Sequence, residues 1–263
     1  MDDGATNRRR SRISSGGGEF ARLALAAAFA VTGTAAALGT AAPGTAAPAT
    51  RALGPPVLIT ARKDLCVTEG EVTALGASGL AVDSPKMRAF LNRATGQSIE
   101  ARFKYLGATA HESPLGSGAV RRQFGLKLEA QDACNLLYAM WRIEPEAKLV
   151  VSVKANPTQH SSAECGNRGY RNVRPARSAP VPSLRPGDAH ALRAELSGTS
   201  MRVLIDGHPV WEGEVGAEAL RLAGPVGLRS DNARLEIELR TAAPLAGAAG
   251  EPKACPTGGA EPE

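Results

Sequence analysis

The chain has 263 residues, a formal net charge of +5 and 22% charged residues. That length suits a leader followed by one large β domain. No run of lysine and arginine interleaved with aromatic residues occurs, so we expect no nucleic-acid partner and no polybasic membrane patch.

Residues 1–47 have the composition of a signal peptide followed by a small-residue linker. An arginine cluster at residues 8–12 precedes an uncharged segment at 23–38, which is the order of an n-region and an h-region. The Ala-, Pro- and Gly-rich run that follows offers cleavage points near Ala42 or Ala47. We therefore expect an extracellular or periplasmic protein with no stable membrane span after cleavage. An uncleaved anchor is the alternative, but the apolar run is shorter than the ~20 residues of a stable span.

The export route stays undecided between the general secretory and twin-arginine pathways. Arg9 and Arg10 precede a weakly hydrophobic segment, which is typical of the twin-arginine route. Ser11 and Arg12, however, separate that pair from the first apolar residue. Cysteines that form disulfide bonds also fit poorly with folding in a reducing cytosol.

Four cysteines in an exported chain predict two disulfide bonds. Three pairings are possible, and the spacing favours Cys134 with Cys165 and Cys66 with Cys255. These bonds would stabilise the fold by about 3–4 and about 5 kcal/mol, respectively, if loop entropy dominates. Free buried thiols are the alternative, and no C-x-x-C pair supports a zinc site.

Alternation with a period of two predicts strands after the leader. In residues 98–106, Ile99, Phe103 and Tyr105 fall on one face while charged residues fall on the other. The same alternation recurs in three further segments, namely 122–129, 192–196 and 234–240. In the first of these, Phe124 is predicted to face inward. Two segments, 136–143 and 149–153, are apolar on both faces, so we expect them in the middle of a sheet.

Turns and connectors separate these strands. Asp206 and Gly207 predict a tight hairpin turn within residues 201–211. The proline-rich segment 175–186 is predicted to be a connector, because proline cannot donate to a sheet ladder. The Gly-, Ala- and Pro-rich residues 242–263 are predicted to be a flexible tail. About a dozen strands and almost no helix predict an all-β, two-sheet antiparallel jelly-roll sandwich over residues 55–241.

The C-terminal strands resemble the closing strands of the concanavalin A-like lectin/glucanase superfamily, and laminin-G-like and sugar-hydrolase-associated domains most of all. The match lies in the order of four pieces: an alternating strand, a strand ending in an Asp-Gly turn, a G-x-h-G-L segment and a last alternating strand. These pieces are residues 190–198, 201–211, 224–230 and 233–239. The resemblance implies a jelly-roll sandwich that often binds carbohydrate and is sometimes hydrolytic.

The laminarinase-type hydrolases of that superfamily carry an E-x-D-x-x-E type strand, which this sequence lacks. Such a strand places paired carboxylates across a groove, as glycoside hydrolysis requires. Glu236 and Glu238 share a strand face but lie between two arginines, which indicates a solvated, charge-balanced face. We therefore predict no catalytic residue.

Residues 159–174 are the least ordinary segment and the first candidate for a binding site. The candidate ligand-binding residues here are polar or aromatic and lie beside Cys165: His160, Glu164, Asn167, Arg168, Tyr170 and Arg171. Tyr170 offers a stacking surface, and Asn167 and Arg168 offer donors to hydroxyl or carboxylate groups. The alternative is a surface loop shaped by its disulfide bond.

A second candidate is the predicted central strand 136–143. Tyr138 and Arg142 share one face of it, and Trp141, on the other face, is expected in the core. That face would form the floor of a groove. Leu136 and Met140 share it as well, which argues for burial.

We expect a secreted, non-catalytic protein whose partner is a carbohydrate or cell-envelope glycan. The alternatives are a glycan hydrolase or lyase of the same fold with a diverged site, and a structural or adhesive envelope protein with a protein partner. The low aromatic content of 4% weighs against a strong lectin. No cofactor is predicted, since Asp231 and Asn232 offer few of the six to eight oxygen ligands of calcium.

Overall fold

The computed structural model describes residues 56–59, 62–92 and 97–242. The predicted leader, Cys255 and nearly all of the predicted tail lie outside the described residues. Ala242, which the sequence assigned to the tail, is instead the last residue of a strand. That strand continues because residues 239–242 pair with residues 56–59.

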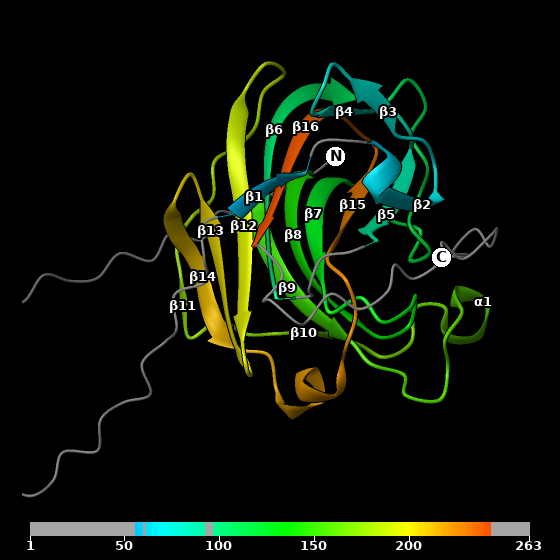
Figure 1. Ribbon diagram of the computed structural model, residues 1–263, viewed down its shortest axis with the longest axis vertical. Helices are drawn as coiled ribbons and strands as arrows, with labels where there is room; N and C mark the ends of the chain where they lie inside the picture. Colours follow the sequence, from blue (N-terminus) through cyan, green and yellow to red (C-terminus); the bar gives the residue numbers. More distant parts are fainter. Residues whose placement is uncertain (1–55, 60–61, 93–96, 243–263) are drawn as a thin grey trace, which may run out of the picture. The chain divides into compact units, whose positions relative to one another are not determined.

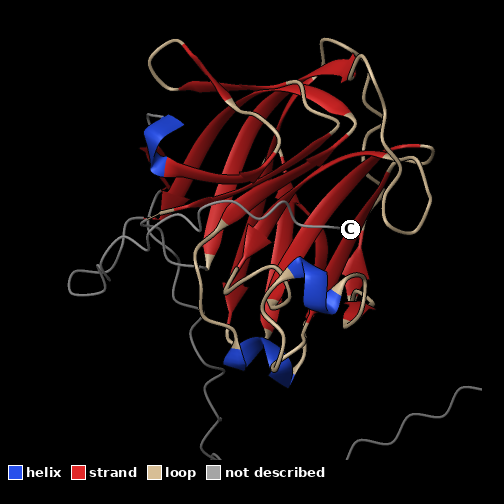
Figure 2. Cartoon of the chain, turned by 90° about the vertical axis from the view of Figure 1, so that its right-hand side faces the viewer, coloured by secondary structure: helices blue, strands red, loops and turns tan. Residues whose placement is uncertain are grey.

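The described residues form two antiparallel sheets (Figures 1 and 2), which confirms the predicted all-β sandwich. The first sheet has nine strands. In spatial order they are β11 (Arg177–Ser178), β14 (His208–Glu214), β13 (Ser200–Ile205), β12 (Ala189–Ser197), β6 (Ser98–Ala108), β16 (Ala233–Ala242), β4 (Gly79–Val82) and β3 (Thr73–Leu75), with β1 (Pro56–Ile59) paired to β16.

The second sheet has seven strands. In spatial order they are β10 (Tyr170–Asn172), β9 (Lys148–Lys154), β8 (Leu136–Glu144), β7 (Arg122–Leu128), β15 (Gly227–Asp231), β5 (Lys86–Leu91) and β2 (Leu65–Glu69). Three short helical segments accompany the strands: η1 (Arg62–Asp64), α1 (Ser162–Cys165) and η2 (Ala217–Arg221). None of the helical segments in the described part of the chain has the length and apolarity to cross a membrane.

The core lies between the two sheets and follows the predicted alternation. Along β6, Phe103 and Tyr105 are buried, whereas Arg102 and Lys104 are exposed. The Phe103 ring packs against Phe124 of β7, with ring centroids 5.0 Å apart. It also meets Trp141 of β8 edge-on at 5.7 Å, which confirms that Trp141 belongs to the core. These contacts join the two sheets.

The predicted hairpin turn is confirmed, whereas the prediction that the proline-rich segment 175–186 is only a connector is wrong. Asp206 and Gly207 take φ angles of 51° and 81° between β13 and β14, as a tight turn requires. The proline-rich segment contains the edge strand β11, which pairs with β14. It can do so because residues 176–179 contain no proline, and Ala176 and Ala179 donate to the carbonyl groups of β14.

We expect Phe124→Ala to lower the free energy of unfolding by about 3–5 kcal/mol, because it leaves a cavity in the core where the Phe124 ring packs against Phe103. Leu220→Ala is the matched control: Leu220 is 64% exposed, so its loss should cost less than about 0.5 kcal/mol. Urea denaturation followed by tryptophan fluorescence measures both. Equal losses would show that the core lies elsewhere.

Candidate functional site

The outer face of the seven-stranded sheet carries polar residues that the strand register places side by side. Tyr138 of β8 lies opposite Ser152 of β9, which lies opposite Asn172 of β10. Two residues further along β8, Met140 begins a row that continues through Gly125, Arg229 and Arg88. The next row runs from Arg142 through Gln123 to Asp231. Strands distant in sequence thus build one surface.

Gly125 lies in the middle of this face, where neighbouring atoms leave no room for a side chain. A Cβ atom there would come within 2.4 Å of the Ala139 carbonyl oxygen and 2.5 Å of the Met140 sulfur. The neighbouring Arg229 places its guanidinium carbon 5.4 Å from the centre of the Tyr138 ring. Glycine at this position therefore leaves room for the side chains that cover the sheet.

A buried carboxylate organises the charges on this face. Asp231 is 0% exposed, and its Oδ1 lies 2.7 Å from an Arg88 nitrogen. Its Oδ2 accepts hydrogen bonds from Gln123 at 2.6 Å and from Arg229 at 2.9 Å. Burial alone would raise the pKa of Asp231, but the charges of Arg229 and Arg88 hold that pKa at about 2. The carboxylate is therefore ionised and fully engaged.

Two tyrosines form an aromatic pair beside this network. The rings of Tyr138 and Tyr170 stack with centroids 5.9 Å apart and planes 25° apart. Tyr138 is 2% exposed, whereas Tyr170 is 38% exposed. Lys154 Nζ lies 4.9 Å from the centre of the Tyr170 ring, and an Arg229 nitrogen donates to the Tyr170 hydroxyl at 3.4 Å. The pair is thus held by cations and keeps one ring partly open to solvent.

A cleft of about 320 Å³ lies over this face. Its lining includes four of the predicted ligand-binding residues, namely Tyr138, Arg142, Asn167 and Tyr170. The cleft also takes in residues that the sequence did not single out: Arg88, Arg121, Gln123, Ser152, Asn172 and Arg229. The alternation of side chains along β7 and β15 could have shown that Gln123 and Arg229 face away from the core.

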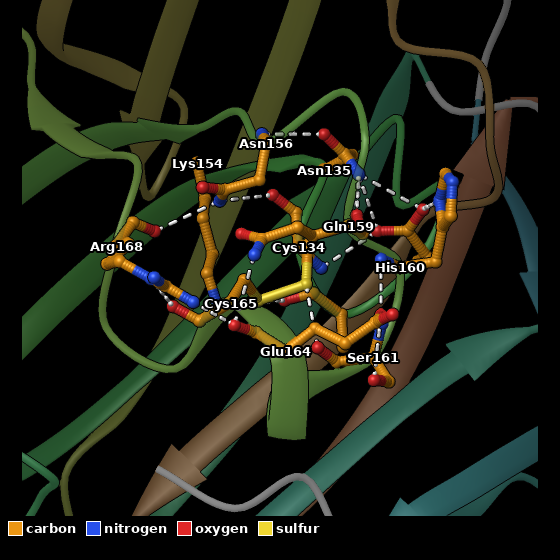
Figure 3. The surroundings of a disulfide bond; sticks show 12 residues. Cys134, Asn135, Lys154, Asn156, Gln159, His160, Ser161, Glu164, Cys165 and Arg168 are labelled. Atoms are coloured by element: carbon orange, nitrogen blue, oxygen red, sulfur yellow. Dashed lines mark hydrogen bonds and ion pairs between the residues drawn. A yellow bond between two sulfur atoms is a disulfide. The ribbon is translucent and has the colours of Figure 1, made fainter.

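The disulfide bond between Cys134 and Cys165 is confirmed. It joins the chain before β8 to the end of α1 (Figure 3), and a closed loop of this length stabilises a fold by about 3–4 kcal/mol. Cys66 is also disulfide-bonded, whereas Cys255, its predicted partner, lies outside the described residues.

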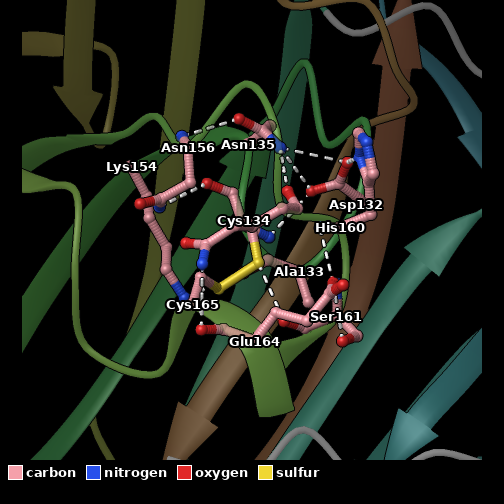
Figure 4. Close-up of polar contacts among 11 residues, drawn as sticks. Asp132, Ala133, Cys134, Asn135, Lys154, Asn156, His160, Ser161, Glu164 and Cys165 are labelled. Carbon is pink, nitrogen blue, oxygen red and sulfur yellow. Dashed lines mark hydrogen bonds and ion pairs between the residues drawn. A yellow bond between two sulfur atoms is a disulfide. The ribbon is translucent and has the colours of Figure 1, made fainter.

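Polar contacts shape the loop around this bond (Figure 4). Asn135 donates to Asp132 at 2.9 Å and to the Gln159 carbonyl at 2.8 Å. His160 Nδ1 lies 2.8 Å from Asp132, and this contact raises the pKa of the exposed imidazole. The loop is therefore fixed by its own hydrogen bonds.

The other four predicted ligand-binding residues do not line the cleft. The backbone N–H groups of His160 and Ser161 donate to Glu164 and hold its pKa at about 2. Arg168 donates to the Glu164 carbonyl, and Arg171 pairs with Glu218 of η2. His160, Glu164, Arg168 and Arg171 therefore have structural contacts in this protein, while Asn167 and Tyr170 of the same segment face the cleft.

The oxygens that the sequence offered for calcium are engaged by protein donors. Those of Asp231 bind two arginines and a glutamine, and Asn232 Oδ1 accepts from the Ser113 N–H at 2.8 Å. Across the part of the chain that the structure describes, no group of three or more His, Cys, Asp or Glu side chains is placed to hold a metal ion.

No protein-family model and no curated protein matches this sequence. Among solved structures, the chain is similar to the carbohydrate binding module CBM66 from Bacillus subtilis, at 14% identity over 68% of this chain and 94% of that chain, with a TM-score of 0.46. It is also similar to domain 4 of AbnA, an extracellular arabinanase from Geobacillus stearothermophilus in complex with arabinotriose (11% identity, 74% and 85% coverage, TM-score 0.38). A third is the galectin LEC-6 from Caenorhabditis elegans (7% identity, 69% and 96% coverage, TM-score 0.36).

We expect Asp231→Asn to remove about 2 kcal/mol of pH-dependent stability. The pKa of Asp231 is lowered from 3.8 to about 2, so its contribution is present above pH 4 and lost as the pH falls towards 2. The stability difference between the wild type and the variant should therefore shrink over that range in urea titrations. The exposed Asp83 supplies the control Asp83→Asn, which should follow the wild type. A constant difference across pH would contradict the charge network.

Proposed function

We propose that this protein is a secreted, non-catalytic carbohydrate-binding protein that binds glycan in the cleft on the outer face of the seven-stranded sheet. The observation that carries the proposal is the stacked pair Tyr138 and Tyr170 within a cleft that polar side chains line. Sugar rings present apolar C–H faces and hydroxyl rims, so aromatic rings beside planar polar groups suit them.

The partly exposed ring of Tyr170 is the stacking surface. Tyr138 supports it from one side, and Lys154 and Arg229 contact it. A ring held in this way loses little conformational freedom when a ligand binds, which favours affinity. Asn167 and Asn172 are exposed at the same cleft and supply donors and acceptors for hydroxyl groups.

The carboxylates around the cleft support binding without catalysis. Glycoside hydrolysis needs two carboxyl groups that flank the scissile bond. Among the described residues that line the cleft there is no aspartate or glutamate. Asp231 is fully buried; its oxygens are engaged by lining residues, and its low pKa keeps it from acting as an acid. Export is supported by the composition of residues 1–47 and by the disulfide bond.

We expect Tyr170→Ala to weaken glycan binding by about three- to tenfold, because aromatic contacts of this kind contribute about 0.5–1.5 kcal/mol. Tyr170→Phe should retain the affinity. A glycan array on the protein from residue 50 onwards selects the ligand, and isothermal titration calorimetry then measures its Kd. His208→Ala, an exposed change on the β13–β14 hairpin, is the control.

Two results would overturn this proposal. One is an array with no glycan bound above background. The other is a Tyr170→Ala variant that binds as tightly as the wild type. Release of reducing ends or unsaturated sugars from a bound polysaccharide would contradict the non-catalytic part alone.

A further inference from the structure

Cations dominate the side chains that line the cleft. Five of its described lining residues are basic: Arg88, Arg121, Arg142, Lys154 and Arg229. Because the described lining holds no acidic residue, the cleft presents a positive field to a bound ligand.

Arg88 and Arg229 each have a counter-ion among the described residues. Arg88 and Arg229 both contact the buried Asp231 at hydrogen-bond distance, and Arg88 also lies 3.8 Å from Glu69. Lys154 donates to the Ala133 carbonyl at 2.9 Å. The charges of Arg88 and Arg229 are therefore offset before any ligand binds.

Arg121 and Arg142 differ from these residues. Neither forms an ion pair with another described residue, and the Nε of Arg142 is buried without a hydrogen-bond partner there. Burial first, and then the charge of Arg121, lower the pKa of Arg142. Glu146, the acid that acts on Arg142, pairs instead with Lys148 at 2.6 Å.

The neighbouring Arg122 shows the contrast. It pairs with Glu112 at 2.6 Å and with Glu144 at 2.5 Å. The chain thus neutralises Arg122 and leaves its neighbour Arg121 facing the cleft together with Arg142. Two like charges held together in a partly buried place are costly, and an anion between them relieves that cost.

We propose that Arg121 and Arg142 form a carboxylate subsite, so that the cleft takes an acidic oligosaccharide containing uronic acid. This inference rests on the proposed carbohydrate-binding function. Guanidinium groups suit the subsite because their planar fork matches a carboxylate with two parallel hydrogen bonds.

The strand geometry sets the size of the ligand. Tyr138 and Arg142 lie on the same face of β8, four residues apart, which is about 13 Å along a strand. A ligand that reaches both the tyrosine pair and the arginine subsite is longer than one sugar ring. The geometry therefore favours an oligosaccharide in which a uronate lies near Arg142 and another residue stacks on Tyr170.

Calorimetry with an oligogalacturonate, its fully methyl-esterified form and a neutral oligoglucan tests this inference. We expect the free acid to bind about ten- to hundredfold more tightly than the ester, which is the usual range for a hydrogen bond to a charged group. Arg142→Gln and Arg121→Gln should each remove most of that preference. Neither variant loses an ion pair to a described residue, so thermal unfolding should show both folded.

Arg177→Gln is the control. It removes the same charge from an exposed site whose nearest acid, Glu212, is 3.9 Å away, and it should leave the preference intact. Equal binding of acid and ester would overturn the carboxylate subsite while leaving carbohydrate binding in place. A sulfated glycan that binds as tightly as the uronate would also overturn it, because the site would then be a general anion site. Failure of every glycan to bind would overturn the proposed function as well.

Discussion

The buried carboxylate of Asp231 is the interaction on which the outer face of the seven-stranded sheet depends. It binds Arg88 of β5, Gln123 of β7 and Arg229 of β15, three strands that are remote in sequence. Without it, Arg229 and the buried Arg88 would each lose an ion pair, and breaking a buried ion pair is strongly destabilising. The same contact holds the Arg229 guanidinium over the Tyr138 ring. A polar network therefore builds the floor on which the aromatic pair rests, while the apolar core lies on the opposite side of the sheet.

The loop between β9 and β10 supplies the wall of the cleft, and its shape comes from local contacts. The Cys134–Cys165 bond fixes its base, and Glu164 satisfies backbone N–H groups at the start of α1. Most of the polar side chains in residues 159–174 therefore make contacts that fix the shape of this loop. From this segment Asn167, Tyr170 and Asn172 line the cleft together with the small residues Ser162 and Gly166. Neighbouring residues of the segment thus serve either the shape of the loop or the lining of the cleft.

The sequence predicted the sandwich well because alternation records which side chains face the core. Phe103, Phe124 and Trp141 were all placed inward, and all three lie in the core. Tyr138 and Arg142 were placed together on the opposite face for the same reason. Arg88, Gln123 and Arg229 were missed, because their meeting depends on pairing between β5, β15 and β7, which periodicity does not reveal. His160 and Arg168 drew attention by composition, but the hydrogen bonds that engage them arise only when the loop closes.

The most direct test of where glycan binds is a two-dimensional NMR titration of backbone amides and arginine Nε–Hε groups with the glycan selected by array. We expect shift changes to concentrate on β8, β9, β10 and the loop around Asn167, with a marked change at Arg142 Nε. Changes concentrated instead on β12, β13 and β14 of the other sheet would contradict a binding cleft on the seven-stranded sheet.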